Sequence, residues 1–141
     1  MRRIRGQRGT ALLEAAVTMP ILLLIAVGVF EFGRAYQTWQ VLTNAAREGA
    51  RIAVLPGTTD GQIVTAVRDY MTNGALPEAG AATVTVDRNA AVGAYSGSRI
   101  GVDYPFEFIV LGPVARLVTP SAQTGAPFTL RSAAIMRNET Q

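Results

Sequence analysis

Few side chains in this sequence could do chemistry. The 141 residues contain no cysteine and no histidine, which excludes disulfides, thiolate ligands and the commonest general base. The hydroxyls of Ser96 and Ser98 therefore have no imidazole to activate them. We expect no catalytic residue, no metal and no cofactor, and hence no enzyme. The later carboxylates match no metal-binding or phosphate-binding motif: Asp60, Asp69, Glu78, Asp87, Asp103, Glu107 and Glu139.

Glu14 is the one carboxylate whose surroundings need an explanation. It lies directly before the run AAVTMPILLLIAVGVF, residues 15–30, in which Thr18 and Pro20 are the breaks in apolar character. A charged side chain in the hydrocarbon region costs about 3 kcal/mol by insertion measurements, so a plain membrane anchor would be more stable without it. Glu14 therefore either reaches the membrane surface and does nothing more, or has a role that offsets this cost.

The element that must position Glu14 is an apolar segment of membrane-spanning length. Residues 11–32 are 22 in number, and about 20 apolar residues cross a bilayer. By the positive-inside rule we expect a single-pass inner-membrane protein, with the N-terminus cytoplasmic and the C-terminal domain extracytoplasmic. The chain beyond the first eight residues has nine arginines against ten acids, so we expect no nucleic-acid binding. The remaining basic residues all precede the apolar segment: Arg2, Arg3, Arg5 and Arg8.

Two simpler interpretations of the apolar segment stay open. A cleaved secretory signal needs small residues after its apolar run, and Gly33 and Ala35 could serve. The sequence beyond them continues as a helical pattern, which a cleavage site normally avoids. A plain single-pass anchor fits better, but it leaves Glu14 unexplained.

A helical pattern continues past the apolar segment until Pro56-Gly57. We predict one helix over residues 10–55, 46 residues and roughly 70 Å long, bent near Pro20. Trp39 is expected to pack beneath a sheet, and Tyr36 suits either such packing or the membrane interface. The predicted apolar face of the second half comprises Phe32, Tyr36, Trp39, Thr43, Ala46, Ala50 and Ala53, with Ala35, Leu42 and Gly49 on the neighbouring stripe.

Charged residues on this helix are spaced for ion pairs. Glu31 and Arg34 are three residues apart at the outer membrane boundary. We expect an interfacial pair there, with docking to another subunit as the alternative. Glu48 precedes Arg51 by three residues, and Arg47 lies one turn before Arg51, which allows modest ion-pair support.

The remaining sequence predicts a second helix and a small sheet. Thr59 and Gln62 have the spacing of a capping box, and Gly74 is the expected stop of the helix that they begin. The buried face of this helix is predicted to hold Ile63, Val67, Tyr70 and Met71. Alternation of apolar and polar residues predicts three antiparallel strands, through Val84 and Val86, through Ile100, Val102, Tyr104, Phe106 and Phe108, and through Leu130, Ser132, Ala134 and Met136.

Three further features refine this α+β prediction. The stretch NAAVGAYSGS, residues 89–98, has the pattern of a loose connection. Pro105 inside the second alternating run indicates a free edge or a bulge nearby. The letters VARLV, residues 114–118, fit a short helical turn. One apolar face of the sheet needs a cover, which the long helix and the second helix can supply.

Three blocks of sequence carry a resemblance to a known family: RGTALLEAAVTMPILLLIAVGVFEFGRAY, NAAREGARIAV and SAAIMRNE. They resemble the TadE-like family, the minor pilins (pseudopilins) of tight-adherence, or Flp, type IV pilus systems. The resemblance implies a pilin-like α+β domain at the end of the long transmembrane helix. The most distinctive blocks, EFGRAY and NAAREGAR, contain Glu31, Phe32, Gly33, Arg34, Tyr36, Arg47, Glu48, Gly49 and Arg51.

The resemblance also implies a role for Glu14. In the family, a prepilin peptidase cuts after a glycine behind a short basic leader, and the fifth residue of the product is glutamate. The matching positions here are Gly9, Thr10 and Glu14, with MRRIRGQRG as the leader. The new amine of Thr10 could then meet Glu14 of a neighbouring subunit, and Pro20 lies in the same assembly segment. Ala15 departs from the aromatic residue that family members often have after the glutamate.

Taken together, these features predict a non-catalytic minor pilin that assembles or initiates a tight-adherence pilus. The expected partners are the inner membrane, the prepilin peptidase, other pilins or pseudopilins and the pilus assembly platform. The alternative is a single-pass, membrane-anchored exported binding domain that pilin machinery does not process. The expected divisions are a leader at 1–9, a transmembrane half-helix at 10–32 and an exported domain at 33–141.

Overall fold

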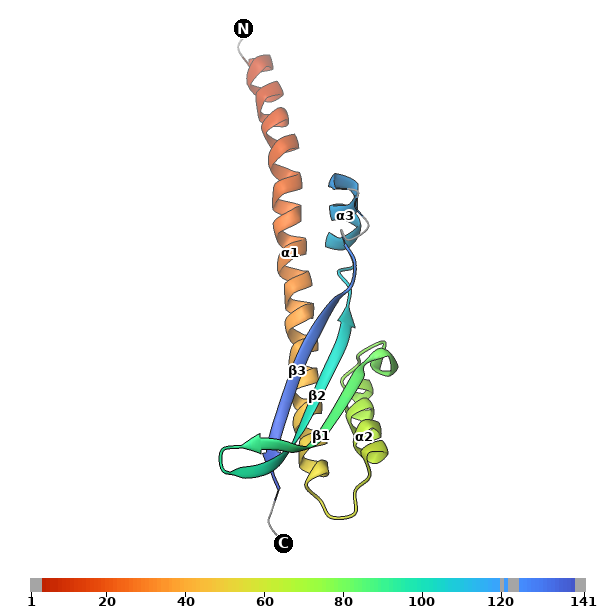
Figure 1. Cartoon of the computed structure of the whole chain (residues 1–141). Helices are drawn as coiled ribbons and strands as arrows, with labels where there is room; N and C mark the ends of the chain where they lie inside the picture. The colour runs from red at the N-terminus through yellow and green to blue at the C-terminus, as the bar shows by residue number, and fades with distance from the viewer. Residues whose placement is uncertain (1–3, 120, 122–124, 139–141) are drawn as a thin grey trace. The chain divides into compact units, whose positions relative to one another are not determined.

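A computed structural model describes residues 4–119, 121 and 125–138, with side chains described from residue 9 onward (Figure 1). These elements confirm the predicted α+β class, with a long N-terminal helix, a second helix and an antiparallel sheet. In chain order they are α1 (Ile4–Ala53), α2 (Asp60–Asn73), the 3-10 helix η1 (Ala79–Ala81), β1 (Thr83–Val92), β2 (Tyr95–Phe106), α3 (Leu111–Val118) and β3 (Phe128–Arg137).

The chain divides into two compact units, and α1 contributes to both. One unit, called the helical unit below, comprises Met1–Arg34 and Phe108–Gly125. The other, the sheet unit, comprises Ala35–Glu107 and Ala126–Gln141. The segment that contains α3 is therefore an excursion from the sheet unit, leaving after β2 and returning before β3.

Helix α1 begins earlier than the sequence predicted. The expected start was Thr10, but the helix already includes Ile4 and continues without interruption through Pro20 to Ala53. Apart from its glycines, the stretch IRGQRG consists of residues with fair helix propensity, so the helix can extend backward through it. Residues 1–3 of the predicted leader lie outside the described residues.

The sheet has the order β1-β2-β3, with both pairs antiparallel and β2 in the centre. The stretch at residues 89–98, predicted as a loose connection, is instead a hairpin whose turn contains Gly93 at φ 61°. Pairing with β1 shifts register between Asp87 and Ala90, a bulge that the sequence did not reveal. Pro105 lies beyond the pair Thr83↔Asp103, so it faces no β1 partner, in agreement with the predicted free edge.

The inward face of the sheet follows the predicted alternation. Ile100, Val102, Tyr104 and Phe106 on the central strand are buried, and the predicted residues of the other two strands are half-buried. Phe108 was predicted to continue the second strand, but β2 ends at Phe106. Phe108 instead belongs to the helical unit, where its ring lies 5.9 Å from that of Phe32 in an edge-to-face contact.

The sheet is covered on this face by α2 and by the sheet-unit part of α1 (Figure 1). The buried face of α1 overlaps the predicted one, since Ala46, Ala50 and Ala53 are buried, as are Ala35, Leu42 and Gly49 on the neighbouring stripe. Trp39 was expected to pack beneath the sheet, yet it is 41% exposed. Tyr36, for which packing and the membrane interface were both open, is 62% exposed. Small side chains replace them at the contact, because bulky rings would hold the helix away from the sheet. The side chains that are actually buried on this part of α1 are Ala35, Thr38, Leu42, Ala45, Ala46, Ala50 and Ala53.

Helix α2 begins at the predicted capping box and ends at Gly74, as predicted. Thr59 accepts a hydrogen bond from the Gln62 backbone, and the Gln62 side chain accepts one from Thr59, completing the capping box. Tyr70, predicted to be buried, is 40% exposed. Gly74 caps the helix at a negative φ, and Ala75 adopts the left-handed conformation at φ 59°. A side chain at Gly74 would approach the Cγ1 atom of Val41 to 2.6 Å, so close packing requires the glycine.

Candidate functional site

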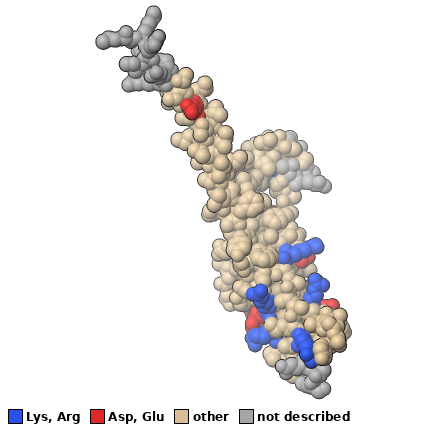
Figure 2. All heavy atoms as spheres, turned by 90° about the vertical axis from the view of Figure 1, so that its left-hand side faces the viewer, with Lys and Arg blue, Asp and Glu red and all other residues tan. Residues whose placement is uncertain are grey.

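The N-terminal part of α1 exposes apolar side chains on all of its faces. Every large apolar residue from Leu12 to Ile25 is more than half exposed, and on the face drawn in Figure 2 this stretch is almost wholly uncharged. Gly9–Ala53 contains a segment long and apolar enough to cross a membrane. A helix that is apolar all round is stable only in an apolar environment. This exposed stretch is therefore the first candidate site.

The predicted processing residues lie on the exposed start of this stretch. Gly9, Thr10 and Glu14 are all helical and exposed, and so is Pro20. Thr10 and Glu14 are four residues apart, one helical turn, so their side chains share a face of α1. The bond between Gly9 and Thr10 is thus accessible, but it lies within regular helix.

Glu31 occupies the most enclosed charged position of the helical unit. Its side chain has no exposed surface, and its Oε1 atom accepts a 2.6 Å hydrogen bond from the backbone N–H of Val110. Val110 is the N-cap residue of α3, so a carboxylate from α1 satisfies one of the unpaired donors at the start of that helix. The negative charge also complements the positive end of the α3 dipole. Glu31 therefore fastens the start of α3 to α1.

Arg34 completes this junction. Its Nη2 atom lies 3.1 Å from the Oε2 atom of Glu31, so the two residues form the i,i+3 pair for which their spacing is suited. The contact with Val110, which is 79 residues from Glu31 in the chain, was not predicted from the sequence. No local pattern around Glu31 points to a backbone donor at that distance.

The NAAREGAR block serves helix support and packing in the sheet unit. Arg51 donates hydrogen bonds of 2.9 and 2.5 Å to the carboxylate of Glu48, and these bonds hold the pKa of Glu48 below its ordinary value. Both side chains are partly exposed, so water screens the pair. Arg47 lies 3.5 Å from the Asn44 side-chain oxygen. Gly49 is buried, and a Cβ there would approach Val67 Cγ2 to 2.5 Å.

Gly33 and Phe32 of the EFGRAY block are both exposed. A Cβ built on Gly33 meets nothing within 4 Å. Phe32 is exposed over 66% of its surface and makes its ring contact with Phe108. Neither residue is in the core. Their exposure leaves them available to lipid or to another chain.

Arg88 on β1 has a structural role that was not predicted from the sequence. From β1 its guanidinium donates to the carbonyl of Ala53 at 3.2 Å, to the carbonyl of Thr58 at 2.6 Å and to Asp60 Oδ1 at 2.8 Å. These acceptors are the last residue of α1, the connection, and the first residue of α2. One side chain therefore fixes the end of one helix and the start of the next.

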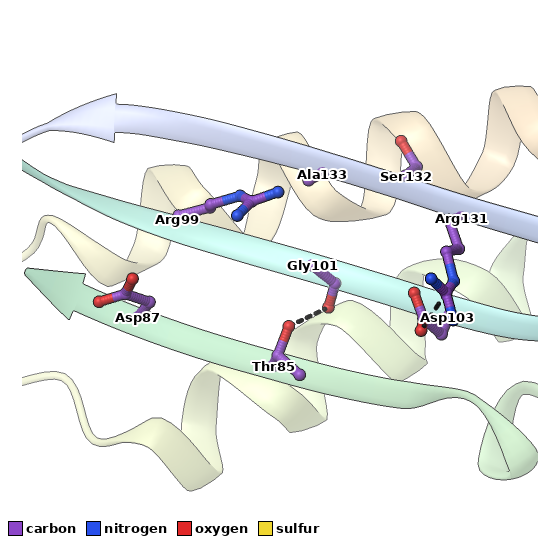
Figure 3. Close-up of a pocket in the computed structure, with 8 residues that line it drawn as sticks. All are labelled: Thr85, Asp87, Arg99, Gly101, Asp103, Arg131, Ser132 and Ala133. Carbon is purple, nitrogen blue, oxygen red and sulfur yellow. Dashed lines mark hydrogen bonds and ion pairs between the residues drawn. The ribbon is translucent and has the colours of Figure 1, made fainter. Parts of the chain in front are cut away.

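The outer face of the sheet carries an open polar depression of about 350 Å³ (Figure 3). Asp87 lies opposite Arg99, and Asp103 lies opposite Arg131 with 3.3 Å between Oδ2 and Nε. Opposite charges on neighbouring strands stabilise pairing. Among the residues whose placement is described, no group of three or more acidic side chains could hold a metal ion. Glu139, one of the carboxylates considered above, lies outside the described residues.

These features define a class: an α+β domain carried on one N-terminal apolar helix, which indicates single-pass membrane anchoring. Residues 9–51 match the family model described as TadE-like protein, so the predicted resemblance to this family is confirmed over that segment. The matched segment contains Glu14, the EFGRAY block and the NAAREGAR block. The family points to involvement with tight-adherence pili. No curated protein and no solved structure matches the chain.

Proposed function

We propose that this protein is a non-catalytic minor pilin, or pseudopilin, of a tight-adherence (Flp) type IV pilus. The observation that carries the proposal is the family match over residues 9–51, which starts at the proposed processing glycine and covers the whole exposed apolar part of α1. In the proposed state the N-terminus is cytoplasmic and residues 10–32 span the inner membrane. The domain at 33–141 is extracytoplasmic. After assembly, the protein is also located in the pilus. Residues 1–9 are the removed leader.

Processing by a prepilin peptidase is the first step of the proposed function. The scissile bond between Gly9 and Thr10 is exposed, as a protease requires, but it lies inside α1. The peptidase must therefore unwind the first turns of the helix, where the side chains of residues 9–26 are all exposed. Glycine at the cut position lowers the cost of this local unwinding.

The product amine and Glu14 form the proposed assembly contact. Opposite charges about 4 Å apart attract by roughly 4 kcal/mol at an effective dielectric near 20, before desolvation. Thr10 and Glu14 lie on the same face of α1, one helical turn apart. Within one chain, the Thr10 amine and the Glu14 carboxylate are therefore separated along the helix axis. Packing of a neighbouring helix, shifted along the axis, gives both charges a partner in the membrane. The pair then sets the register between subunits and contributes less to raw stability.

The intact mass of the chain recovered from membranes tests this proposal directly. The protein is expressed with an active prepilin peptidase and, in parallel, with a catalytically dead one. We expect loss of residues 1–9, with Thr10 as the new N-terminus, only with the active enzyme. A full-length chain beside a second, demonstrably processed pilin would favour the alternative, an anchored exported binding domain. A cut near Ala35 would identify the apolar segment as a secretory signal.

A further inference from the structure

We propose that the segment 108–118, with α3 at its end, enters the outer lipid leaflet beside α1 and forms a second membrane contact. Its sequence, FIVLGPVARLV, contains one charged residue, Arg116, and no acid. Leu117 is 85% exposed and Val118 is 79% exposed, and Ile109 at the other end of the segment is 62% exposed. Apolar side chains so fully exposed in the chain itself need an apolar partner.

The place where α3 is attached decides what that partner is. The Glu31–Val110 hydrogen bond and the contact between the rings of Phe32 and Phe108 tie the start of the segment to the outer end of the apolar stretch of α1. Both views show α3 standing beside α1 (Figures 1 and 2). The exposed apolar surface of α3 is therefore continuous with a surface that already requires lipid. A lipid leaflet is the partner that covers both surfaces at once.

Polar groups at both ends of α3 have partners within the protein. Backbone groups in hydrocarbon must be paired within the protein. Glu31 pairs the N–H of Val110 at one end of α3, and Thr119 N donates to Ala115 O at the other end. Arg116 donates to the carbonyl of Gly125 at 2.6 Å, and its long side chain can hold its charge at the headgroup level.

Half-buried residues of α1 indicate toward which end of that helix the segment 108–118 extends. Val27 and Gly28, one turn before Glu31, are half-buried, whereas residues 9–26 are exposed. The helical unit consists of this part of α1 and the excursion Phe108–Gly125. The cover thus extends from Glu31 toward the membrane-spanning part of α1, not away from it. Entry of α3 into the leaflet follows from that direction.

Single-cysteine variants of the full chain test this inference, since the described residues include no native cysteine and neither does the rest of the sequence. Leu117→Cys carries an environment-sensitive fluorophore in vesicles of phosphatidylcholine and phosphatidylglycerol, some containing a lipid with a nitroxide on its acyl chain. Leu24→Cys, in the apolar part of α1, is the positive control. Leu55→Cys, a 47% exposed apolar position in the sheet unit, is the matched negative control.

We expect nitroxide lipids to quench the Leu117 probe several-fold more than the Leu55 probe, at a level near that of Leu24. Quenching no greater than at Leu55 would overturn the inference. A blue-shifted but unquenched Leu117 probe would also overturn it, because protein and not lipid would then cover α3. The inference rests on membrane insertion of α1 and not on pilus assembly. An unquenched Leu24 probe would overturn both insertion and this inference, whereas failed processing at Gly9 would leave it standing.

Discussion

At the scale of single residues, Glu14 carries the most specific expectation. Its carboxylate is exposed on an apolar helix, so its loss removes a cost of insertion and no contact of the fold. Glu14→Ala should therefore leave membrane insertion and folding unchanged. It should reduce the incorporation of the protein into pili, or the number of pili, at least tenfold, as measured by immunoblots of sheared pili. Thr18→Ala, one turn further along the same apolar stretch, is the control and should assemble normally.

Equal loss of pili in both variants would contradict a role for the charge of Glu14. It would show instead that assembly depends on the shape of the whole helix surface. Normal pili in both variants would show that Glu14 only reaches the membrane surface and has no role in assembly.

Gly49 is the residue on which the packing of α1 against the sheet unit depends most closely. A Cβ at this position would meet Val67 at 2.5 Å and Ile100 at 3.1 Å, within a core that has no exposed surface at either residue. We expect Gly49→Ala to lower the free energy of unfolding by about 1–3 kcal/mol through overpacking. Denaturant titration of the detergent-solubilised chain, followed by circular dichroism, measures the effect.

Gly61→Ala is the matched control for Gly49→Ala. Gly61 is also helical, but it is exposed and a Cβ there meets nothing within 4 Å. Its replacement should be neutral or stabilise α2 by up to about 1 kcal/mol, because alanine has the higher helix propensity. Destabilisation of both variants by the same amount would argue against a close contact at Gly49.

At the scale of elements, the attachment of α3 depends on Glu31. Glu31→Ala removes the acceptor for the Val110 N–H and the partner of Arg34 in one change. Amide hydrogen exchange of residues 110–118 should become at least tenfold faster, since the start of α3 loses its cap. Glu48→Ala is the control, because Glu48 has the same i,i+3 pairing with an arginine and is not part of the α3 junction. Unchanged exchange in Glu31→Ala would contradict the fastening role.

The connection between α1 and α2 depends on Arg88. Arg88→Ala leaves the carbonyls of Ala53 and Thr58 and the carboxylate of Asp60 without this donor. We expect a loss of about 1–3 kcal/mol in the free energy of unfolding, with faster exchange of the α2 N-terminal amides. Arg131→Ala, which removes an exposed ion pair on the sheet, should cost less than about 1 kcal/mol. Equal costs would show that Arg88 acts as a surface charge only.

Local sequence patterns predicted the helices and strands, but they did not predict contacts between segments that are distant in the chain. The capping box at Thr59 and the alternation in β2 are set by neighbours in sequence, and both were confirmed. On α1 the prediction was right for the small residues Ala46 and Ala50 and wrong for Trp39, because periodicity places Trp39 on the same face while close helix–sheet packing selects small side chains. The Glu31–Val110 contact and the reach of Arg88 join residues far apart in the chain, which periodicity does not report.

At the scale of the whole molecule, the charge distribution predicts the orientation. Four arginines precede the apolar segment, and the rest of the chain has nearly balanced charge. Replacing Arg2, Arg3, Arg5 and Arg8 by glutamine should reduce the fraction of chains with an extracytoplasmic domain, as protease accessibility in spheroplasts would measure. The same change at four exposed arginines of the domain is the control and should leave the orientation unchanged: Arg68, Arg99, Arg131 and Arg137.

The path of the chain between β2 and β3 has a consequence for engineering. Phe106 and Phe128 are paired in register, and their ring centroids lie 5.3 Å apart. Strands β2 and β3 are therefore held together at the end where the excursion leaves and returns. Closing a loop costs free energy that grows only with the logarithm of its length. The segment between β2 and β3 is thus an insertion that can be exchanged, because the β2–β3 hairpin is complete without it. A tight turn or a reporter peptide could replace it while the three strands keep their register.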